Sequence, residues 1–499
     1  MAKKLGGVLA LLGTCALSSF LLSCGSSSSR PSGVLYALTQ GSNGYGNNVS
    51  SFAMDLNSGV LSLVNSNANT CPTAASASDP EPCGLPLDIL LDPTGANAFV
   101  LNQGTPCIQQ GNVCIAGTAT ILPTIYPFTV NSDGSLSQPG TALYWTCLVQ
   151  PAAPCTATNS NPDTALAMVR DAAGQFLFVI DQGVYPQPLT CPAIGTAVNS
   201  AADATNFLGC PSISVFTMAA GSLTPVSQSS IYQSPFFLSK TPSALSPITF
   251  TASGTSQELL FATNNYDLCT IDCLQPGATN PAPGTPNNDT VSVYALSSSG
   301  VLTEQPNSPY PVSAQNPISL LAVNTNIAGQ ATGGVFVYVG QGAGAGAVYP
   351  FYVCTAQNSN TNCSPSQTAG NFMFPLTTCP LLSCQVPPSA VGAQPVQMVV
   401  DPTNTFLYGI SNGANQVWGF KIATTAGSLA PQVPPNLPAG TAPVSIAIHP
   451  TVDNTGQYLY VSANASDNII GFTISTTTGT MSALPPSTAP SAPSGIAVH

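Results

Sequence analysis

The chain has 499 residues, of which 44% are hydrophobic and 5% charged, with six Lys and Arg against 18 Asp and Glu and a net charge of −12. The hydrophobic fraction excludes an intrinsically disordered chain. The scarcity of basic residues leaves no cationic surface for nucleic acids or anionic lipid headgroups, so we expect no nucleic-acid partner.

Residues 1–23 have the features of a bacterial export signal. Lys3 and Lys4 form a basic start, an apolar stretch follows to residue 22, and small residues flank Cys24. A membrane-spanning helix fits less well, because Gly, Thr and Ser interrupt the apolar stretch. The run Leu-Leu-Ser-Cys at residues 21–24 resembles the lipobox of bacterial lipoproteins, which implies cleavage before Cys24 and a lipid on that cysteine. The alternative is an ordinary secreted protein with a chance cysteine.

This signal predicts where the mature protein resides. Residues 24–32 form a lipidated cysteine followed by a short Ser-rich tether. Gly25 after the cysteine resembles the pattern that sorts lipoproteins to the outer membrane. We therefore expect a protein of the cell envelope, held at a membrane by its lipid anchor only. Removal of residues 1–23 takes away two lysines and no acid, which leaves four basic and 18 acidic residues and a net charge of −14.

From residue 33 onward the chain consists of imperfect copies of one unit, clearest at residues 443–481. Four short runs are separated there by turns rich in Gly, Pro, Asn and Asp, and runs this short are strands rather than helices. The third run of each copy carries an aromatic residue, and seven copies can be counted. The aromatic residues are Phe52, Phe128, Phe216, Tyr294, Phe351, Phe420 and Phe472.

Apolar residues fall on both faces of these third strands, as expected when each sheet packs between two others. The first copy lacks its opening strand and begins at Gly33, whereas the chain stops at residues 493–499, which match a first strand. The last strand should therefore complete the N-terminal blade. The sequence predicts an all-β fold over residues 33–499, a closed seven-bladed β-propeller of four-stranded antiparallel blades, and we expect a monomer.

Fourteen cysteines remain after Cys15 in the signal and Cys24 at the lipid site, and they form sequence-local couples. None has the spacing with histidines that a zinc site needs, so we expect disulfides and no metal. Nearly all the couples fall in long loops after second and fourth strands, all on one face of the ring, where binding usually resides. The expected bridges join Cys71 to Cys83, Cys107 to Cys114, Cys147 to Cys155, Cys191 to Cys210, Cys269 to Cys273, Cys354 to Cys363, and Cys379 to Cys384.

The repeat pattern resembles the lactonase-type seven-bladed propellers, the family of 6-phosphogluconolactonase-like and YVTN-repeat proteins. The resemblance covers residues 33–499 and rests on first strands and turns such as Leu-Asp-Ile-Leu-Leu-Asp-Pro-Thr-Gly at 87–95, followed by second strands such as Tyr-Leu-Tyr-Val at 458–461. It implies the propeller fold. It also implies that a family enzyme would open a sugar lactone with His, Arg and acidic side chains near the ring axis.

The residues themselves favour binding over catalysis. His449 and His499, the two histidines, share a turn position with Asp92, Asp171 and others whose side chains can hydrogen-bond nearby backbone, so we interpret them as turn residues. A phosphosugar would need several cations, and few are present. We therefore predict no catalytic residue and no cofactor, with lactone hydrolysis as the alternative.

One polar series could form a binding site. The last residues of the second strands should surround the ring axis on the face with the long loops. Uncharged amides and hydroxyls there suit a neutral polar ligand such as a glycan, or a protein partner, although turn formation alone would also explain these residues. The candidates for ligand binding are Asn102, Asp181, Asn264 and Gln341.

Overall fold

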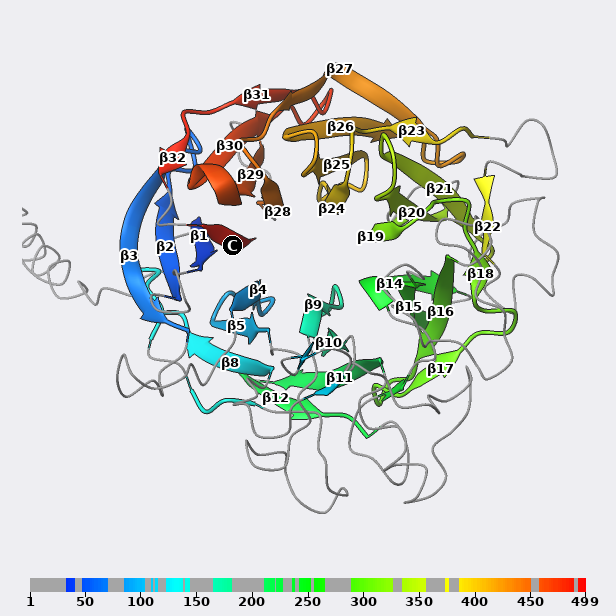
Figure 1. The fold of residues 1–499 in the computed structure, drawn as a ribbon, viewed down its shortest axis with the longest axis horizontal. Helices are drawn as coiled ribbons and strands as arrows, with labels where there is room; N and C mark the ends of the chain where they lie inside the picture. The colour runs from blue at the N-terminus through cyan, green and yellow to red at the C-terminus, as the bar shows by residue number, and fades with distance from the viewer. Residues whose placement is uncertain are drawn as a thin grey trace, which may run out of the picture.

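Seven antiparallel sheets surround one central axis in the computed structural model of this chain (Figure 1). The predicted seven-bladed propeller is confirmed. Among the described residues, no helix is long and apolar enough to cross a membrane. The structure describes residues 33–40, 47–70, 85–103, 109–110, 113–114, 123–137, 140–143, 165–181, 211–219, 221–227, 236–237, 242–252, 255–264, 289–325, 334–355, 373–376, 386–449, 457–488 and 492–499.

The predicted export signal, Cys24 and the tether that follows it lie outside the described residues. Their roles in export and lipid attachment stay predictions.

Each blade, numbered 1 to 7 from the N-terminus, runs outward from the axis. The inner strands of blades 2 to 7 are β4 (Pro86–Leu91), β9 (Ala165–Arg170), β14 (Pro242–Ala252), β19 (Pro317–Asn324), β24 (Pro395–Val400) and β28 (Pro443–Ile448), and that of blade 1 is β33 (Pro493–Val498). The second strands, from blade 1 to blade 7, are β1 (Val34–Thr39), β5 (Asn97–Asn102), β10 (Phe176–Asp181), β15 (Thr255–Asn264), β20 (Val335–Gln341), β25 (Phe406–Ser411) and β29 (Gln457–Ala463).

The predicted aromatic residues all lie in the third strands. These strands are β2 (Asn48–Met54), β8 (Thr124–Thr129), β11 (Ser212–Ala219), β16 (Thr290–Leu296), β21 (Ala347–Val353), β26 (Gln416–Ile422) and β30 (Asn468–Ile474). The outer strands are β3 (Leu61–Asn69), β12 (Ser222–Pro225), β17 (Leu302–Glu304), β22 (Met373–Pro375), β27 (Leu429–Pro438) and β31 (Met481–Ala483).

Blade 2 departs from the expected four strands. Its sheet consists of β4, β5 and β8, and among the described residues only single bridges, Ile125 to Leu143 and Val130 to Leu136, occupy the outer position.

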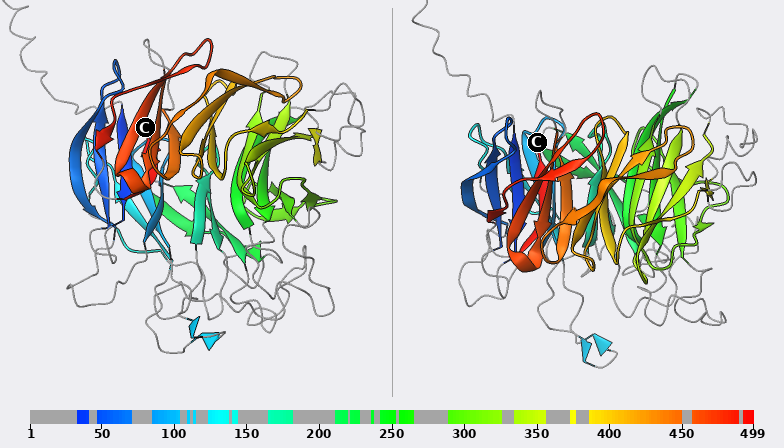
Figure 2. Two further views of the ribbon diagram at one scale, coloured as in Figure 1. Left: turned by 45° about the horizontal axis from the view of Figure 1, so that its top comes forward. Right: turned by 90° about the horizontal axis from the view of Figure 1, so that it is seen from above.

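Several smaller elements supplement the blades. Four short strands lie beside third strands, and a 3₁₀ helix follows β29. A separate hairpin of two short strands stands off one face of the ring in the side views (Figure 2). These elements are β13 (Phe236–Phe237), β18 (Tyr310–Pro311), β23 (Ser389–Ala390), β32 (Ser487–Thr488), the helix at Asn464–Ser466, and the hairpin strands β6 (Gln109–Gln110) and β7 (Val113–Cys114).

The C-terminal strand closes the ring as predicted. β33 pairs antiparallel with β1, and Val34 and His499 exchange two backbone hydrogen bonds of 3.0 and 2.9 Å. Blade 1 therefore combines the two ends of the chain, and the order of its sheet is β3-β2-β1-β33. The closure pairs the inner edge of β1 with β33, so that the backbone groups at the seam are not left exposed.

The inner strands share a local geometry that the sequence encodes. Six of the seven begin with proline, which has no N–H to donate and is tolerated at the first position of a strand. Directly after that position the pairing skips one residue, so that Pro86 pairs with Asn102 but Asp88 pairs with Leu101. The same bulge recurs in β19, β24 and β28. A bulge increases the twist of a strand, and here it recurs at the same point around the ring.

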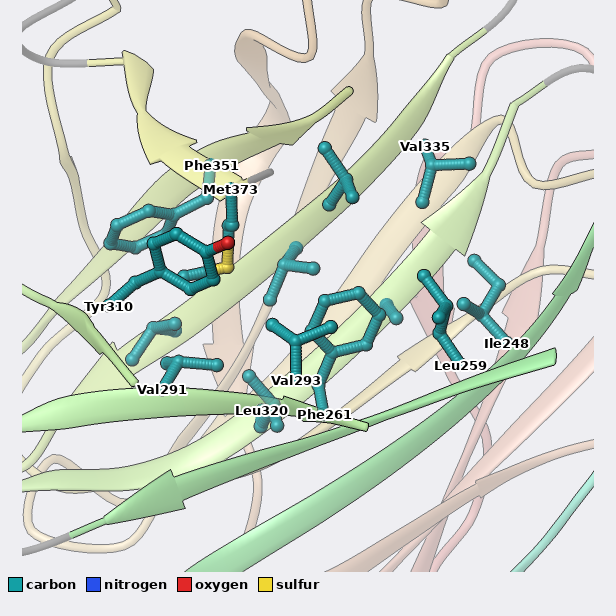
Figure 3. Close-up of a cluster of buried hydrophobic side chains, with 14 of the residues drawn as sticks. Ile248, Leu259, Phe261, Val291, Val293, Tyr310, Leu320, Val335, Phe351 and Met373 are labelled. Carbon is teal, nitrogen blue, oxygen red and sulfur yellow. The ribbon is translucent and has the colours of Figure 1, made fainter. Parts of the chain in front are cut away.

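The hydrophobic core lies between neighbouring blades. Between blades 4 and 5, Val291 and Val293 of β16 pack with Leu320 and Phe351 of blade 5 (Figure 3). The next residue of β16, Tyr294, belongs to the cluster on the side of blade 3. Successive residues thus face opposite neighbours, which confirms that apolar residues on both faces of a strand are buried by two blades.

A tyrosine-to-glycine contact joins several pairs of blades. In four second strands, the residue three places before the end is a buried tyrosine whose hydroxyl donates to a glycine carbonyl in the next blade, as from Tyr408 to Gly479 at 2.7 Å. Each acceptor glycine has a positive φ, 73° at Gly479, which suits the tight turn between third and outer strands. The other three contacts run from Tyr36 to Gly134, from Tyr338 to Gly427 and from Tyr460 to Gly59.

Candidate functional site

The turn between the inner and second strands is stabilised as the sequence predicts. Asp401 accepts hydrogen bonds from the backbone N–H groups of Thr405 and Phe406 at 2.7 and 2.6 Å, and Asp92 accepts one from Ala96 at 2.9 Å. These carboxylates therefore fix the turns. The interpretation of the aspartates as turn residues is confirmed.

Both histidines occupy the same turn position. His449 is 1% exposed, and its backbone N–H donates to the carbonyl of Tyr458 at 2.8 Å. The imidazole of His499 packs against the turn of blade 2. A Cβ added to Gly95 in that turn would lie only 2.3 Å from the imidazole ring. His449 is thus buried at its turn and the partly exposed His499 packs against a turn, placements that favour the structural role predicted for them.

Two of the four predicted ligand-binding residues are buried and hydrogen-bonded, Asn102 to the chain that leaves blade 1 and Asn264 within its own blade. Asn102 is 0% exposed and donates to the carbonyl of Thr70 at 3.1 Å, while Asn264 is 3% exposed and donates to Thr290 and Ser292 at 3.0 and 2.9 Å. These amides connect the end of the second strand to its neighbours. Their role in ligand binding stays a prediction.

The other two predicted residues differ from each other in exposure. Asp181, the last residue of β10, is also 0% exposed. Gln341 is partly exposed, donates to the carbonyl of Ala343 at 3.0 Å and accepts from the N–H of Gln315 at 3.3 Å. The structure therefore brings the four residues to corresponding strand ends but encloses all except Gln341.

Asp88, near the start of β4, joins blade 2 to blade 3. Its carboxylate accepts hydrogen bonds from the N–H of Met168 on β9 at 3.1 Å and of its own neighbour Ile89 at 2.9 Å. Burial raises the pKa of the Asp88 carboxyl to about 7, against the opposing effect of those two donors.

The same link recurs in other blades with uncharged side chains. Gln397 accepts from the N–H of Ile446 at 2.8 Å, and Ser445 accepts from the N–H of Ile496 at 3.3 Å. Asp88 is thus the titratable member of a series of links between blades.

A second charged group lies further along β9, at the end of the inner strands of blades 2 to 4. It consists of Arg170 and Asp171 from blade 3 and Glu258 from blade 4, with Arg170 and Glu258 each interacting with Asp171, and we call it the Arg170 group. The guanidinium of Arg170 donates to the carbonyl of Asp171 at 3.1 Å, and the charges of Asp171 and Asp92 both act on it. Burial lowers the pKa of Arg170, while those two carboxylates oppose the shift.

The acids of the Arg170 group keep oxygen atoms without partners. Asp171 is 1% exposed; its Oδ1 accepts from the N–H of Phe176 at 2.8 Å, but its Oδ2 has no partner among the described residues. Oε1 of Glu258 is likewise buried and unpaired there. Burial, and secondly the charge of Asp171, raises the pKa of Glu258 to about 7. A carboxyl group with this pKa can take and give a proton at neutral pH.

The sequence analysis did not single out Glu258, and it set Arg170 aside because that residue belongs to the turn region away from the long loops. One signal was available, since Arg170 is among only six basic residues and directly precedes a turn aspartate. No group of three or more metal-ligating side chains occurs in the described part of the chain.

Two of the cysteines predicted to form disulfides are among the described residues. Cys354 is buried just after the end of β21, and it is disulfide-bonded. Its partner is not among the described residues, so the pairing with Cys363 stays a prediction. Cys114 lies in β7, in a hairpin with β6, within one of the long loops that we expected after second strands.

The other twelve cysteines predicted to form disulfides fall in segments outside the described residues, so the couples to which they were assigned stay predictions. These cysteines are Cys71, Cys83, Cys107, Cys147, Cys155, Cys191, Cys210, Cys269, Cys273, Cys363, Cys379 and Cys384.

Comparison with known proteins supports the family resemblance. Residues 385–497 match the family described as "Lactonase, 7-bladed beta-propeller". No curated protein sequence matches the chain.

Solved structures share the fold over nearly the whole chain. A candidate 6-phosphogluconolactonase from Bacteroides fragilis aligns with a TM-score of 0.53 and 13% identity, over 94% of this chain and 98% of that one. A periplasmic gluconolactonase from Pseudomonas aeruginosa aligns with a TM-score of 0.52 and 16% identity, over 93% and 98%. At these identities the likeness establishes the fold, and the resemblance to lactonase-type propellers is confirmed.

Proposed function

Starting from a propeller of the lactonase type, we propose that this protein is an exported, lipid-anchored hydrolase that opens an uncharged lactone. The observation that carries the proposal is the Arg170 group, which combines a carboxyl of pKa about 7 with a guanidinium. Both belong to a fold shared with a periplasmic gluconolactonase. This choice replaces the binding role that the sequence favoured, because the comparisons support the alternative better.

The chemistry requires a base and a stabilising positive charge. Glu258 takes a proton from water, the water oxygen bonds to the lactone carbonyl carbon, and the ring C–O bond breaks. The proton then passes to the ring oxygen, which becomes the hydroxyl of a hydroxy acid. Arg170 stabilises the negative charge that develops on the carbonyl oxygen. Burial, and secondly the repulsion from the charge of Asp171, keeps Glu258 partly protonated near neutral pH by raising its pKa.

An uncharged substrate follows from the scarcity of cations. The described part of the chain contains two basic side chains besides the histidines, Arg170 and Lys421, and Lys421 lies exposed on the third strand of blade 6. A phosphate group would call for several converging cations. We therefore expect a neutral lactone to be opened faster than its phosphorylated form.

The test is hydrolysis of glucono-1,5-lactone and 6-phosphogluconolactone, followed as acid release above the spontaneous rate. Glu258→Gln should lower kcat by about 10²-fold or more, as expected for loss of a general base. Glu304→Gln, on the outer strand β17, is the matched control and should leave the rate unchanged. No hydrolysis above background, or equal rates in both variants, contradicts the proposal.

A second candidate is a binding module for a neutral polar ligand such as a glycan. Two observations favour it: Gln341 is partly exposed, and Oδ1 of Asn102 is buried without a partner among the described residues. Titration calorimetry of the Glu258→Gln variant with a panel of oligosaccharides tests this role separately from catalysis. Binding heat that disappears in Gln341→Ala would support it, and heat unchanged by that substitution would argue against this site.

A further inference from the structure

One corner of blade 1 exposes apolar side chains. Val60, Leu63 and Val64 have exposed fractions of 41%, 57% and 39%. They lie at the turn between β2 and β3 and on the first residues of β3, the outer edge of the blade (Figure 1). No charged residue occurs in β3. We call these three side chains the blade-1 corner.

Contacts with blade 7 hold this corner in place. The turn is closed by a hydrogen bond of 3.0 Å from the N–H of Asp55 to the carbonyl of Val60. Tyr458 and Tyr460 of blade 7 donate their hydroxyls to the carbonyls of Leu56 and Gly59 at 3.0 and 2.7 Å. The apolar side chains are therefore presented by an anchored turn, and their exposure is a property of the folded ring.

The lipid tether reaches the fold at the same corner. Gly33, the first residue after the tether, accepts a hydrogen bond of 2.9 Å from the N–H of Met54 at the end of β2. A Cβ on Gly33 would lie 2.6 Å from Cδ2 of Leu56, in the turn itself. Gly33 follows Cys24 by nine positions, and a chain of that length spans at most about 30 Å. A lipid on Cys24 would thus keep this corner close to the bilayer.

We propose that the blade-1 corner docks on the lipid bilayer surface and makes a second contact beside the lipid anchor. This inference rests on the lipid anchor included in the proposed function, and it is independent of catalysis. A single acyl signal binds membranes weakly, and a second apolar contact strengthens the attachment. Asp55, the charged residue of the turn, is exposed, so the corner suits neutral lipid headgroups better than anionic ones.

Docking at this corner orients the ring. The turns between third and outer strands lie at the same end of the blades as the turns after the inner strands, and the long loops with the cysteines leave from the opposite end. The long-loop face would therefore point away from the bilayer. Blade 4 lies across the ring from β3, whereas blade 3 lies along the bottom of the view, beside blade 2 (Figure 1).

The experiment uses the lipidated full-length protein in phosphatidylcholine vesicles that contain brominated lipid, which quenches nearby tryptophan. Val64→Trp should be quenched several-fold more strongly than Val433→Trp, the matched control, because Val433 is 81% exposed on β27 of blade 6. Adding Leu63→Ser to the Val64→Trp chain should reduce the quenching. Both chains carry the same anchor, so the difference reports the corner alone.

The outcomes distinguish docking of the blade-1 corner from attachment by the lipid anchor. Vesicle flotation with equal quenching at both positions overturns the docking and leaves the anchor intact. Failure of the protein to float, together with no incorporation of labelled fatty acid, overturns both. A blue-shifted, unquenched tryptophan at position 64 with a dimer in sedimentation overturns lipid docking and assigns the corner to a second copy of the chain.

Discussion

At the scale of single residues, polar side chains that face the neighbouring blade determine how the blades are joined. Asp88, Gln397 and Ser445 occupy equivalent positions and accept hydrogen bonds from the next inner strand. Each satisfies a backbone N–H that would otherwise be buried without a partner. Of these three only Asp88 titrates, so one of these links depends on pH.

The first prediction concerns this pH dependence. The pKa of Asp88 is raised from 3.8 to about 7, so between these values the folded protein binds more protons than the unfolded chain. Its stabilising contribution is full below about pH 4 and is lost as pH rises through 7. Relative to Asp88→Asn, the wild-type melting temperature should therefore fall as pH rises from 4 to 8.

Gln397→Glu is the complementary variant, because it places a carboxyl at the equivalent position in blade 6. It should introduce a similar loss of stability with rising pH. Differential scanning calorimetry over this pH range measures both variants. A constant difference between wild type and Asp88→Asn at every pH would show that Asp88 keeps its ordinary pKa.

The second prediction concerns the tyrosine-to-glycine contacts. Tyr408→Phe removes a buried hydroxyl and leaves the carbonyl of Gly479 unpaired, which should cost about 1–3 kcal/mol of unfolding free energy. The aromatic ring of the new phenylalanine should still fit, since phenylalanine fills the equivalent position in three blades, at Phe99, Phe178 and Phe261.

Denaturant unfolding measures this loss. Phe178→Leu alters packing without removing a hydrogen bond, so it is a reference for the packing effect. Unchanged stability of Tyr408→Phe would mean that water replaces the hydroxyl.

At the scale of elements, the inner strands combine a regular start with variable side chains. The initial proline and the bulge after it place the next polar residue toward the neighbouring blade, and the same construction repeats around the ring. β33 has this construction too, although it lies at the C-terminus and pairs with β1 at the start of the fold.

The third prediction follows from that pairing. A chain truncated after Ala492 loses β33, which exposes the inner edge of β1 and removes the buried side chain of Ile496. Burial of an isoleucine side chain is worth about 1.5–3 kcal/mol, and the unpaired backbone groups add to the loss. Thermal melting should show a large decrease or aggregation, whereas deletion of residues 25–30 should have no such effect. Equal melting of the truncated and complete chains would require another mode of closure.

At the scale of the whole molecule, the two faces of the ring differ in the residues and loops that they carry. The short turns after the inner strands carry the Arg170 group and the histidines, while most of the predicted disulfide loops belong to the opposite end. The family resemblance to lactonases gives the fold, and the Arg170 group supplies the chemistry proposed here. The blade-1 corner supplies an orientation at the membrane that is separate from both.

The fourth prediction concerns the loops at the opposite end of the ring. Peptide mapping of the non-reduced protein by mass spectrometry should find each bridge within one loop, because the cysteines of each couple are close in the sequence. Reduction should make these loops more sensitive to protease while the blades stay folded, since a bridge that closes a short loop contributes at most about 3 kcal/mol. A bridge between distant blades, such as one from Cys71 to Cys379, would contradict the predicted loops.

The sequence by itself determined the number of blades, the place of each third strand and the closure by residues 493–499. These features depend on local patterns, since short apolar runs, turn residues and an aromatic position recur within each unit. The turn aspartates were predictable for the same reason, because Asp92 and Asp401 bond to backbone groups four or five residues away.

The tertiary structure alone decided which polar residues form a site. Asp171 and Glu258 are far apart in the sequence, and they interact because blades 3 and 4 pack side by side. The raised pKa of Glu258 arises from that burial, which no local pattern records. Asn102 and Asn264 show the converse, since strand ends that were predicted to expose amides are buried, Asn102 against the chain that leaves blade 1 and Asn264 against β16 of its own blade. Local pattern thus specified the strands, and packing between blades decided exposure, charge and proximity.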